Sequence, residues 1–359
     1  MSDINENGSA PMSDRPKRVG IREVAAAAGV SVTTVSHVLN NTPNAQVRTE
    51  TRERVVATAK RLGYRPSRLA RGLRTRRTQT LGLVGDSVAT TPYAGQMIRG
   101  AQQAAQERGR SIVLFNTEAD PGEEDRDLRT LLGYEVEGII YATMYHRTVS
   151  IPKILEGVPL VLLDAESPDS RVPSVVPDEV QGGCTATAEL IDHGHRRVGF
   201  VTNVDDIPAT SGRLEGYRKA LHAAKIRFDP KLVVSDESEA WGGYRAAREL
   251  LERPNRPTAL FAFNDRMAMG AYRAAAQLGL RIPDDLSIIG FDDQQLITRG
   301  LYPELTSVAL PHYDMGYWAA ATLCDRLDGE SSEAEPPATP LLMGCPLTRR
   351  DSVRPPSDA

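Results

Sequence analysis

From Thr80 onward, short apolar runs alternate with amphipathic stretches, and this alternation restricts the possible fold more than any other feature of the sequence. Such runs indicate strands that are buried on both faces; these need helical crossovers and form parallel sheets. The runs fall into two sets with similar spacing, which predicts two Rossmann-like subdomains. The first set is expected at 81–85, 112–115, 138–141 and 160–164, with a helix near 94–108, and the second at 198–201, 232–234, 259–262 and 287–291.

Polar residues stand at the ends of several of these expected strands. Asp164 closes one strand, Asn264 follows another and Asp292 closes a third, whereas Arg213 stands near the start of an expected helix. Ligands of open parallel sheets bind outside the carboxyl ends of the strands. Carboxylates and a guanidinium can exchange paired hydrogen bonds with vicinal hydroxyls. The pattern therefore predicts a cleft between the subdomains that holds a polyhydroxylated small molecule.

The segment before Thr80 has helical periodicity instead. Apolar residues from Ile21 to Ala28 recur at three- and four-residue spacing, which predicts a helix with one apolar face. Gly29 permits a tight turn, and Ser31 can cap a second helix that runs to Asn40. A third helix, from about Thr49 to Leu62, completes a three-helix core.

Charge is divided unevenly between this segment and the rest of the chain. Residues 15–78 carry 15 Lys and Arg against 3 acids, whereas the whole chain has a net charge of −4, so the remainder carries −16. A basic segment on an acidic body is typical of a head that binds a polyanion, because neutralised phosphates release counterions. A solvated charged surface explains the charge equally well, so charge alone does not decide.

The order of residues in the basic segment adds a more specific signal. The run from Ile21 to Asn40, followed by Thr51-Arg52-Glu53-Arg54-Val55 and by Gly63-Tyr64-x-Pro66, resembles the DNA-binding head of the LacI/GalR family. The resemblance implies a helix-turn-helix with its second helix in the major groove, and a hinge helix whose leucine, by position Leu73, wedges between base pairs in the minor groove. The candidate DNA contacts are Ile21, Ser31, Val32, Thr33, Thr34, Ser36, His37, Asn40, Tyr64, Arg68, Ala70, Arg71 and Leu73.

The body resembles the effector domain of the same family, which is itself similar to periplasmic sugar-binding proteins. Four residues match, by position, effector contacts of sugar-responsive members: Asp164, Arg213, Asn264 and Asp292. Purine-responsive members carry an aromatic ring where this chain has Ser238 and an arginine where it has Ile207, so a sugar or glycoside is expected as effector rather than a nucleobase. The candidate effector contacts are Tyr93, Asp164, Arg213, Trp241, Asn264, Asp292 and His312.

The resemblance implies a transcriptional regulator, expected to be a repressor, that binds pseudo-palindromic double-stranded operator DNA as a homodimer. The sequence lacks the C-terminal leucine heptads that would assemble a tetramer. The expected fold is an all-α helix-turn-helix head joined to an α/β body of two Rossmann-like subdomains. The expected domains are a disordered tail at 1–18, the helix-turn-helix at 19–65, a hinge helix or linker at 66–79, the effector-binding and dimerisation domain at 80–350, and a disordered tail at 351–359.

Other site types find little support in the sequence. No phosphate-cradling glycine-rich motif or nucleophile elbow is present, so no catalytic residue and no cofactor is expected. His193 and His195 lack an accompanying carboxylate or thiol cluster, so no metal is expected. Asp265 and Asp293, beside two of the candidate effector contacts, are expected to cap a helix or a turn.

The cysteines and the apolar runs indicate where the protein is located in the cell, and the fold of the body leaves two other functions open. Three widely spaced cysteines fit neither a disulfide framework nor a zinc cluster, which indicates reduced thiols in a cytoplasm. The apolar runs are short and the first residues are polar, so neither a membrane span nor a signal peptide is expected. The body alone would equally suit a solute-binding protein, or an enzyme on a Rossmann-like fold.

Overall fold

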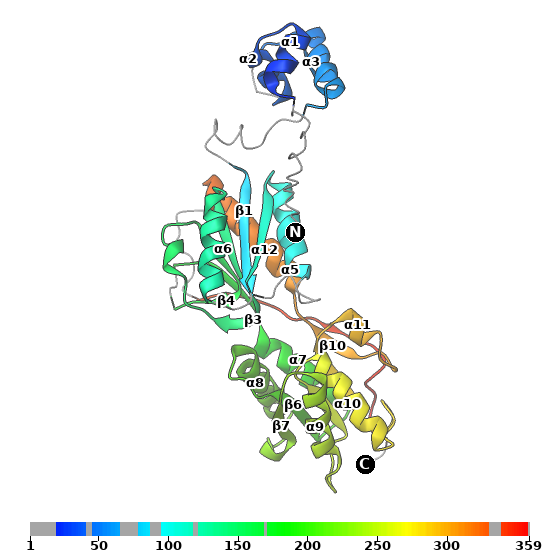
Figure 1. Cartoon of the computed structure of the whole chain (residues 1–359). Helices are drawn as coiled ribbons and strands as arrows, with labels where there is room; N and C mark the ends of the chain where they lie inside the picture. Colours follow the sequence, from blue (N-terminus) through cyan, green and yellow to red (C-terminus); the bar gives the residue numbers. More distant parts are fainter. Residues whose placement is uncertain are drawn as a thin grey trace, which may run out of the picture. The chain divides into compact units, whose positions relative to one another are not determined.

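The computed structural model describes residues 19–40, 45–64, 78–86, 95–117, 121–168, 171–329 and 339–357 (Figure 1). The chain divides into two compact units, Met1–Thr78 and Gln79–Ala359, which we call the head and the body. The tail expected at 1–18 and all but the last two residues of the hinge expected at 66–79 lie outside the described residues.

The head is a bundle of three short helices, as the helical periodicity predicts. They are α1 (Ile21–Ala28), α2 (Val32–Leu39) and α3 (Thr49–Arg61). Each contributes apolar side chains at helical spacing to one small core. The buried members are Val24, Ala25, Ala28, Val35, Val38, Val55 and Ala59.

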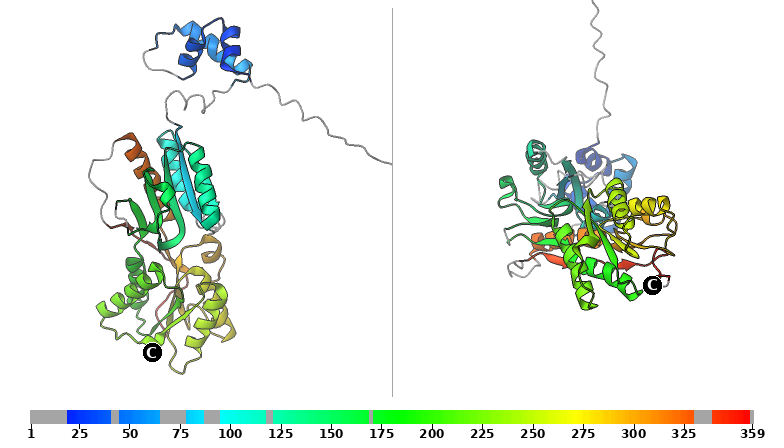
Figure 2. Two further views of the ribbon diagram at one scale, coloured as in Figure 1. Left: turned by 60° about the vertical axis from the view of Figure 1, so that its left-hand side comes forward. Right: turned by 90° about the horizontal axis from the view of Figure 1, so that it is seen from below.

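The body contains two six-stranded sheets, each the centre of one lobe (Figure 2). In the first lobe the strand order is β11-β5-β4-β3-β1-β2, and all the pairs are parallel. Its strands are β1 (Thr80–Asp86), β2 (Ser111–Thr117), β3 (Gly138–Thr148), β4 (Leu160–Glu166), β5 (Ser174–Pro177) and β11 (Leu341–Met343). Its helices are α5 (Gly95–Glu107), α6 (Pro121–Gly133), α12 (His312–Asp328) and the 3₁₀ turn η1 (Lys153–Leu155).

The second lobe has the strand order β12-β10-β9-β8-β6-β7, with β12 antiparallel at one edge. Its strands are β6 (Val198–Asn203), β7 (Val233–Asp236), β8 (Ala259–Ala262), β9 (Ser287–Asp292), β10 (Thr306–Ala309) and β12 (Leu347–Thr348). Its helices are α7 (Glu179–Asp192), α8 (Pro208–Ala223), α9 (Ala240–Leu251), α10 (Asp265–Gln277), α11 (Gln295–Thr298) and the 3₁₀ turn η2 (Pro230–Leu232).

Helices cover both faces of the first sheet, which explains why its strands are apolar on both sides. On one face α5 and α12 pack side by side and bury Met97, Ala101 and Leu323 against the sheet (Figure 1). On the other face α6 buries Leu128 and Leu131. The structure thus has the two α/β subdomains that the alternating pattern predicts.

The chain crosses from one lobe to the other three times: after β5, after β10 and between β11 and β12. Hydrogen bonds join the three crossings to one another. The Asp178 N–H donates to the Met343 carbonyl at 2.8 Å, and the Ala309 N–H donates to the Pro346 carbonyl at 2.7 Å. The Cys345 N–H donates to Oε1 of Gln181 at 2.7 Å. The lobes are therefore connected by a hydrogen-bonded bundle of three chain segments.

All eight strands predicted from the sequence are present, and the differences lie at their ends and at the sheet edges. The short strands β5, β10, β11 and β12 were not predicted, and β3 continues to Thr148. The tail expected to be disordered from residue 351 is partly folded. Ser352 is buried, and its hydroxyl donates to the Ile288 carbonyl at 2.6 Å, so this part of the prediction was wrong. Among the helices of the described ranges, none is long and apolar enough to cross a membrane.

Candidate DNA-binding helix and candidate effector cleft

The turn between α1 and α2 depends on Gly29. This residue adopts the left-handed conformation, with φ of +64°, which side chains with a β-carbon disfavour. In that conformation the N–H groups of Gly29 and Val30 donate to the Ala26 and Ala25 carbonyls, which ends α1. Nε of Arg54 on α3 donates to the Ala28 carbonyl at 3.0 Å. The turn is thereby fixed from both sides and sets the direction of α2.

Several of the candidate DNA contacts hold α2 in shape. The Ser31 hydroxyl caps the helix by accepting from the Thr34 N–H at 3.1 Å, and the two hydroxyls lie 2.9 Å apart. At the other end, Nδ2 of Asn40 donates to the carbonyl and the hydroxyl of Ser36 at 2.8 and 3.1 Å. The side chain of Val32 is 41% exposed.

Four of the remaining candidate DNA contacts are described by the structure, and they differ in how exposed they are. Thr33 is exposed and His37 is partly exposed on α2, whereas Ile21 and Tyr64 are partly buried against the core of the head. The rest lie outside the described residues. They are Arg68, Ala70, Arg71 and Leu73.

The candidate effector cleft is a cavity of about 210 Å³ between the two lobes of the body. It lies at the carboxyl ends of strands from both sheets. Four of the residues that the sequence predicted for an effector site line it together: Asp164, Arg213, Asn264 and Asp292. The candidate Tyr93 lies outside the described residues.

Arg213 is a deeply buried basic side chain of the cavity. Its side chain is 4% exposed, and Nε and Nη2 donate to the Glu179 carboxylate at 2.7 and 3.3 Å. The guanidinium lies 3.6 Å from the centre of the Phe291 ring and 3.7 Å from Oδ1 of Asp292. Carboxylates and a ring face therefore fix its position and neutralise its charge.

Close packing of α7 against α8 produces this geometry. A β-carbon added to Gly216 would meet the Val180 carbonyl at 2.2 Å, and one added to Gly183 would meet the Arg213 carbonyl at 2.5 Å. Only glycine permits so close an approach of two helix backbones. The approach brings Glu179, at the start of α7, within hydrogen-bond distance of Arg213.

Asp164 and Asp292 enter the cavity from opposite sheets. Both adopt positive φ angles, +58° and +99°, which is strained for a residue with a β-carbon. Burial raises the pKa of Asp164 well above its usual range, and Glu179 adds to the effect. Burial likewise raises the pKa of Asp292 to about 6, although Arg213 opposes it. The cavity thus contains two carboxyl groups whose pKa values burial raises above the usual range.

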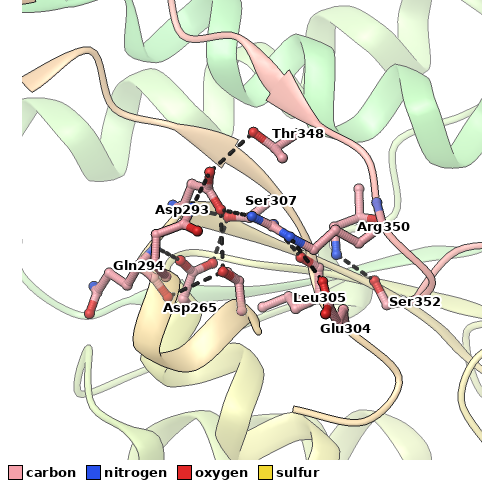
Figure 3. A network of polar contacts seen from close by, with 12 residues as sticks. Asp265, Asp293, Gln294, Glu304, Leu305, Ser307, Thr348, Arg350 and Ser352 are labelled. Carbon is pink, nitrogen blue, oxygen red and sulfur yellow. Dashed lines mark hydrogen bonds and ion pairs between the residues drawn. The ribbon is translucent and has the colours of Figure 1, made fainter. Parts of the chain in front are cut away.

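Two neighbouring acids have structural roles, and so in large part does Asn264. Oδ1 of Asn264 caps α10 by accepting from the Met267 N–H at 2.8 Å, and Nδ2 donates to the Ser238 carbonyl at 2.9 Å. Figure 3 shows Asp265 and Asp293 within one network of polar contacts. Asp265 accepts from the Ser307 hydroxyl at 2.6 Å, and Asp293 pairs with Arg350 at 2.6 Å. Asp265 also accepts from the Gln294 N–H at 2.6 Å, so both carboxylates have partners within the fold.

The two other candidate effector contacts do not line this cavity. Trp241 is 51% exposed and stacks on Tyr244, with 5.0 Å between the ring centres. His312 is buried at the start of α12 and lines a different cavity of about 980 Å³ beside the lobe crossings. Burial lowers the pKa of His312 to about 4, and Arg213 contributes to the same direction.

The sequence reasoning missed one wall of the cavity, formed by Met144, Tyr145 and His146. The apolar run of β3 ends near Tyr141, but the strand continues for seven residues with a register shift against β4. The rule that ligands bind at strand ends would have found this wall if the end of β3 had been placed correctly.

His193 and His195 both form hydrogen bonds within the second lobe. Nδ1 of His193 lies 2.8 Å from the Glu189 carbonyl, and His195 lies between the Thr258 hydroxyl and the Arg354 carbonyl, at 2.9 Å from each. In the part of the chain that the structure describes, no three His, Cys, Asp or Glu side chains gather so as to hold a metal ion.

Comparison with known families matches both units. Residues 20–67 match the model of bacterial regulatory proteins of the lacI family, and residues 187–353 match that of a periplasmic binding protein-like domain. The ribose operon repressor of Escherichia coli K12 is 36% identical over 326 residues, covering 90% of this chain and 98% of the repressor. Catabolite control protein A of Priestia megaterium is 34% identical over 318 residues, covering 88% of this chain and 95% of that protein.

Solved structures give the same picture. A lac repressor dimer bound to operator and the anti-inducer ONPF superposes with a TM-score of 0.78 at 26% identity, covering 94% of this chain and 100% of that chain. The complex of the transcriptional regulator CelR with cellobiose superposes with a TM-score of 0.66 at 34% identity and the same coverage.

Proposed function

The chain belongs to the LacI family of bacterial regulatory proteins, and we propose that the ligand it senses is an uncharged sugar of monosaccharide size. It is a sequence-specific DNA-binding transcriptional regulator, and its relatives are repressors rather than enzymes. The observation that carries the proposal is the small polar cavity between the lobes, where Asp164, Arg213 and Asp292 converge.

The size of the cavity favours a small ligand. Its volume of about 210 Å³ lies below the range of roughly 300–1,000 Å³ that is usual for drug-sized ligands. A single sugar ring suits this volume better than a disaccharide or a nucleoside. Buried carboxyl groups beside a guanidinium are well placed to exchange hydrogen bonds with the hydroxyls of such a ring.

The charges around the cavity favour an uncharged ligand. Five acids line it, and the arginines Arg213 and Arg266 are already paired with Glu179 and Glu239. A phosphate or carboxylate group would therefore meet uncompensated negative charge in a poorly solvated site. Sugar phosphates and nucleotides are therefore disfavoured as ligands.

Relatives suggest the first compounds to test. Ribose operon repressors from Haemophilus influenzae and Escherichia coli are 34% and 36% identical to this chain. The CelR structure holds cellobiose, so a disaccharide provides the contrasting probe. D-Ribose is therefore our first candidate ligand.

For the head, we propose that Val32, Thr33 and His37 on α2 contact base edges in the major groove. The capping contacts of Ser31, Thr34, Ser36 and Asn40 support a role in presenting that face. We assign residues 19–65 to the DNA-binding domain and 66–79 to a hinge that orders on the operator, in a two-fold dimer that binds a pseudo-palindromic site.

The experiment has two linked parts. Duplexes that bind the full-length protein are selected from random DNA at fixed salt, and the selected duplex is then titrated with D-ribose, D-glucose, cellobiose, ribose 5-phosphate and hypoxanthine. We expect a symmetric site whose affinity changes with a monosaccharide. A response to ribose 5-phosphate or hypoxanthine alone would contradict the assigned ligand class, and the absence of any selected site would contradict the DNA-binding role.

A further inference from the structure

His146 is a buried polar side chain on the cavity wall for which the fold itself provides no use. It stands near the end of β3, is 9% exposed and lines the cavity. Neither ring nitrogen has a hydrogen-bond partner among the described residues. The nearest acid is Glu166, with 3.8 Å between Oε1 and Nε2, which is beyond hydrogen-bond distance.

Two further polar atoms without partners belong to residues that line the same cavity from other elements. Oδ1 of Asp164, on β4, is buried and accepts no hydrogen bond, and Nε of Arg266, on α10, is buried and donates none. Buried polar groups in folded proteins are nearly always paired, because an unpaired one loses its hydration without compensation. Four such atoms around one cavity, two of them the ring nitrogens of His146, indicate that their partner is a bound molecule.

The protonation state of His146 defines what that molecule can offer. Burial lowers its pKa, and Arg213 acts in the same direction, whereas Glu179 and Glu166 oppose it. A neutral imidazole has one donor and one acceptor nitrogen. A hydroxyl group also donates and accepts, so it can pair with this ring in either orientation, whereas a phosphate can use only the donor.

We infer that His146 contacts the ligand directly and determines its specificity, by pairing with one hydroxyl while Oδ1 of Asp164 accepts from another. This inference rests on the proposed sugar-sensing function. It assigns to His146 the discrimination between sugars that differ in a single hydroxyl. A site built to hydrogen-bond a hydroxyl rejects an analogue that lacks it, because the protein group is then left unpaired.

The test compares the full-length protein with His146→Phe and His146→Gln. Binding of D-ribose and D-glucose, each with its monodeoxy analogues, is measured by calorimetry. For the sugar that binds the wild type, we expect His146→Phe to weaken binding at least about tenfold. The deoxy analogue that lacks the hydroxyl paired with His146 should bind the wild type weakly. In His146→Phe this analogue and the parent sugar should bind with equal affinity. His146→Gln, which keeps a donor and an acceptor, should recover part of the affinity.

The matched control is His222→Phe, because His222 is exposed on α8 and does not line the cavity. It should leave the affinity for sugar unchanged. If His146→Phe weakens the parent sugar and every deoxy analogue by the same factor, His146 has a structural role and the inference is wrong. Unchanged affinity in His146→Phe also overturns it, with the proposed function intact. If no sugar binds the wild type, the proposed function and the inference both fail.

Discussion

The buried pair of Arg213 and Glu179 is the residue-scale feature with the largest expected effect on stability. In Arg213→Met the Glu179 carboxylate stays buried without its partner, so we expect the free energy of unfolding to fall by about 3–5 kcal/mol. The double variant Arg213→Met with Glu179→Gln removes that uncompensated charge and should regain most of the loss. Urea unfolding at one protein concentration measures both, because dimerisation makes stability depend on concentration.

The exposed pair of Arg248 and Glu252 on α9 is the control for that prediction. Both side chains are about half exposed, so Arg248→Met should cost less than about 1 kcal/mol. If Arg213→Met is no less stable than Arg248→Met, the buried pair does not have the energetic role that its geometry implies. Both Arg213 variants should also lose the response to the ligand.

His312 makes a pH-dependent contribution to stability. Its pKa is lowered to about 4 in the folded protein and is about 6.5 in an unfolded chain. Between these values the unfolded chain binds a proton that the folded protein does not, so stability falls as the pH falls from about 6.5 to about 4. His312→Gln lacks this effect. The stability of His312→Gln relative to the wild type should therefore rise by about 2 kcal/mol between pH 7 and pH 5.

Urea unfolding of both proteins at the two pH values measures this difference. The raised pKa of Asp292, about 6, has the opposite sign, since the folded protein binds a proton between about pH 4 and pH 6 that the unfolded chain does not. That contribution is present in both proteins and cancels in the comparison. Equal changes with pH in the two proteins would show that His312 is not kept neutral by burial.

At the scale of single elements, α2 contains residues of two kinds: some stabilise the helix, and others lie exposed on it, where we expect them to contact DNA. Ser31→Ala removes the cap of α2 and should destabilise the head by about 1 kcal/mol, because the Thr34 N–H loses its partner. Thr33→Ala changes an exposed position and should leave the stability of the head unchanged while weakening operator binding. Hydrogen exchange of the α2 amides in the full-length protein, beside operator titrations, tests both. Faster hydrogen exchange of the α2 amides in Thr33→Ala would show that Thr33 also stabilises the helix and would contradict the prediction.

Elements also show how far the sequence could predict the structure. Uninterrupted apolar runs of three to five residues identified the eight main strands, because burial on both faces leaves a continuous signal. The edge strands β11 and β12 have only three and two residues, too few for periodicity to be recognised. The strand-end rule found Asp164, Asn264 and Asp292. Arg213 was predicted from the family resemblance and its place near a helix start, whereas Trp241 stacks on Tyr244 outside the cavity. The orientation of α9, which decides whether Trp241 reaches the cavity, depends on packing against the rest of the lobe. A short sequence motif does not determine that orientation.

At the scale of the whole molecule, operator binding should depend on the hinge. Leu73 lies outside the described residues, and its role is predicted from the family resemblance alone. If it wedges between base pairs, Leu73→Ala should bend the operator less and bind it roughly tenfold more weakly, since the bent duplex makes additional contacts. Leu342→Ala, at an exposed leucine of the body, is the control. Fluorescence energy transfer across the duplex reports the bend, and an unchanged bend in Leu73→Ala would rule out the wedge.

The three lobe crossings have a consequence for synthesis of the protein on the ribosome. The first lobe begins at β1, but its helix α12 and its strand β11 come from residues 312–343, after nearly all of the second lobe. Without α12, the apolar faces of Met97 and Ala101 on α5 have no helix to pack against. During translation the second lobe can therefore complete most of its sheet while the first lobe still exposes apolar surface. The nascent chain is thus most prone to aggregation, and most dependent on chaperones, just before residues 312–343 emerge.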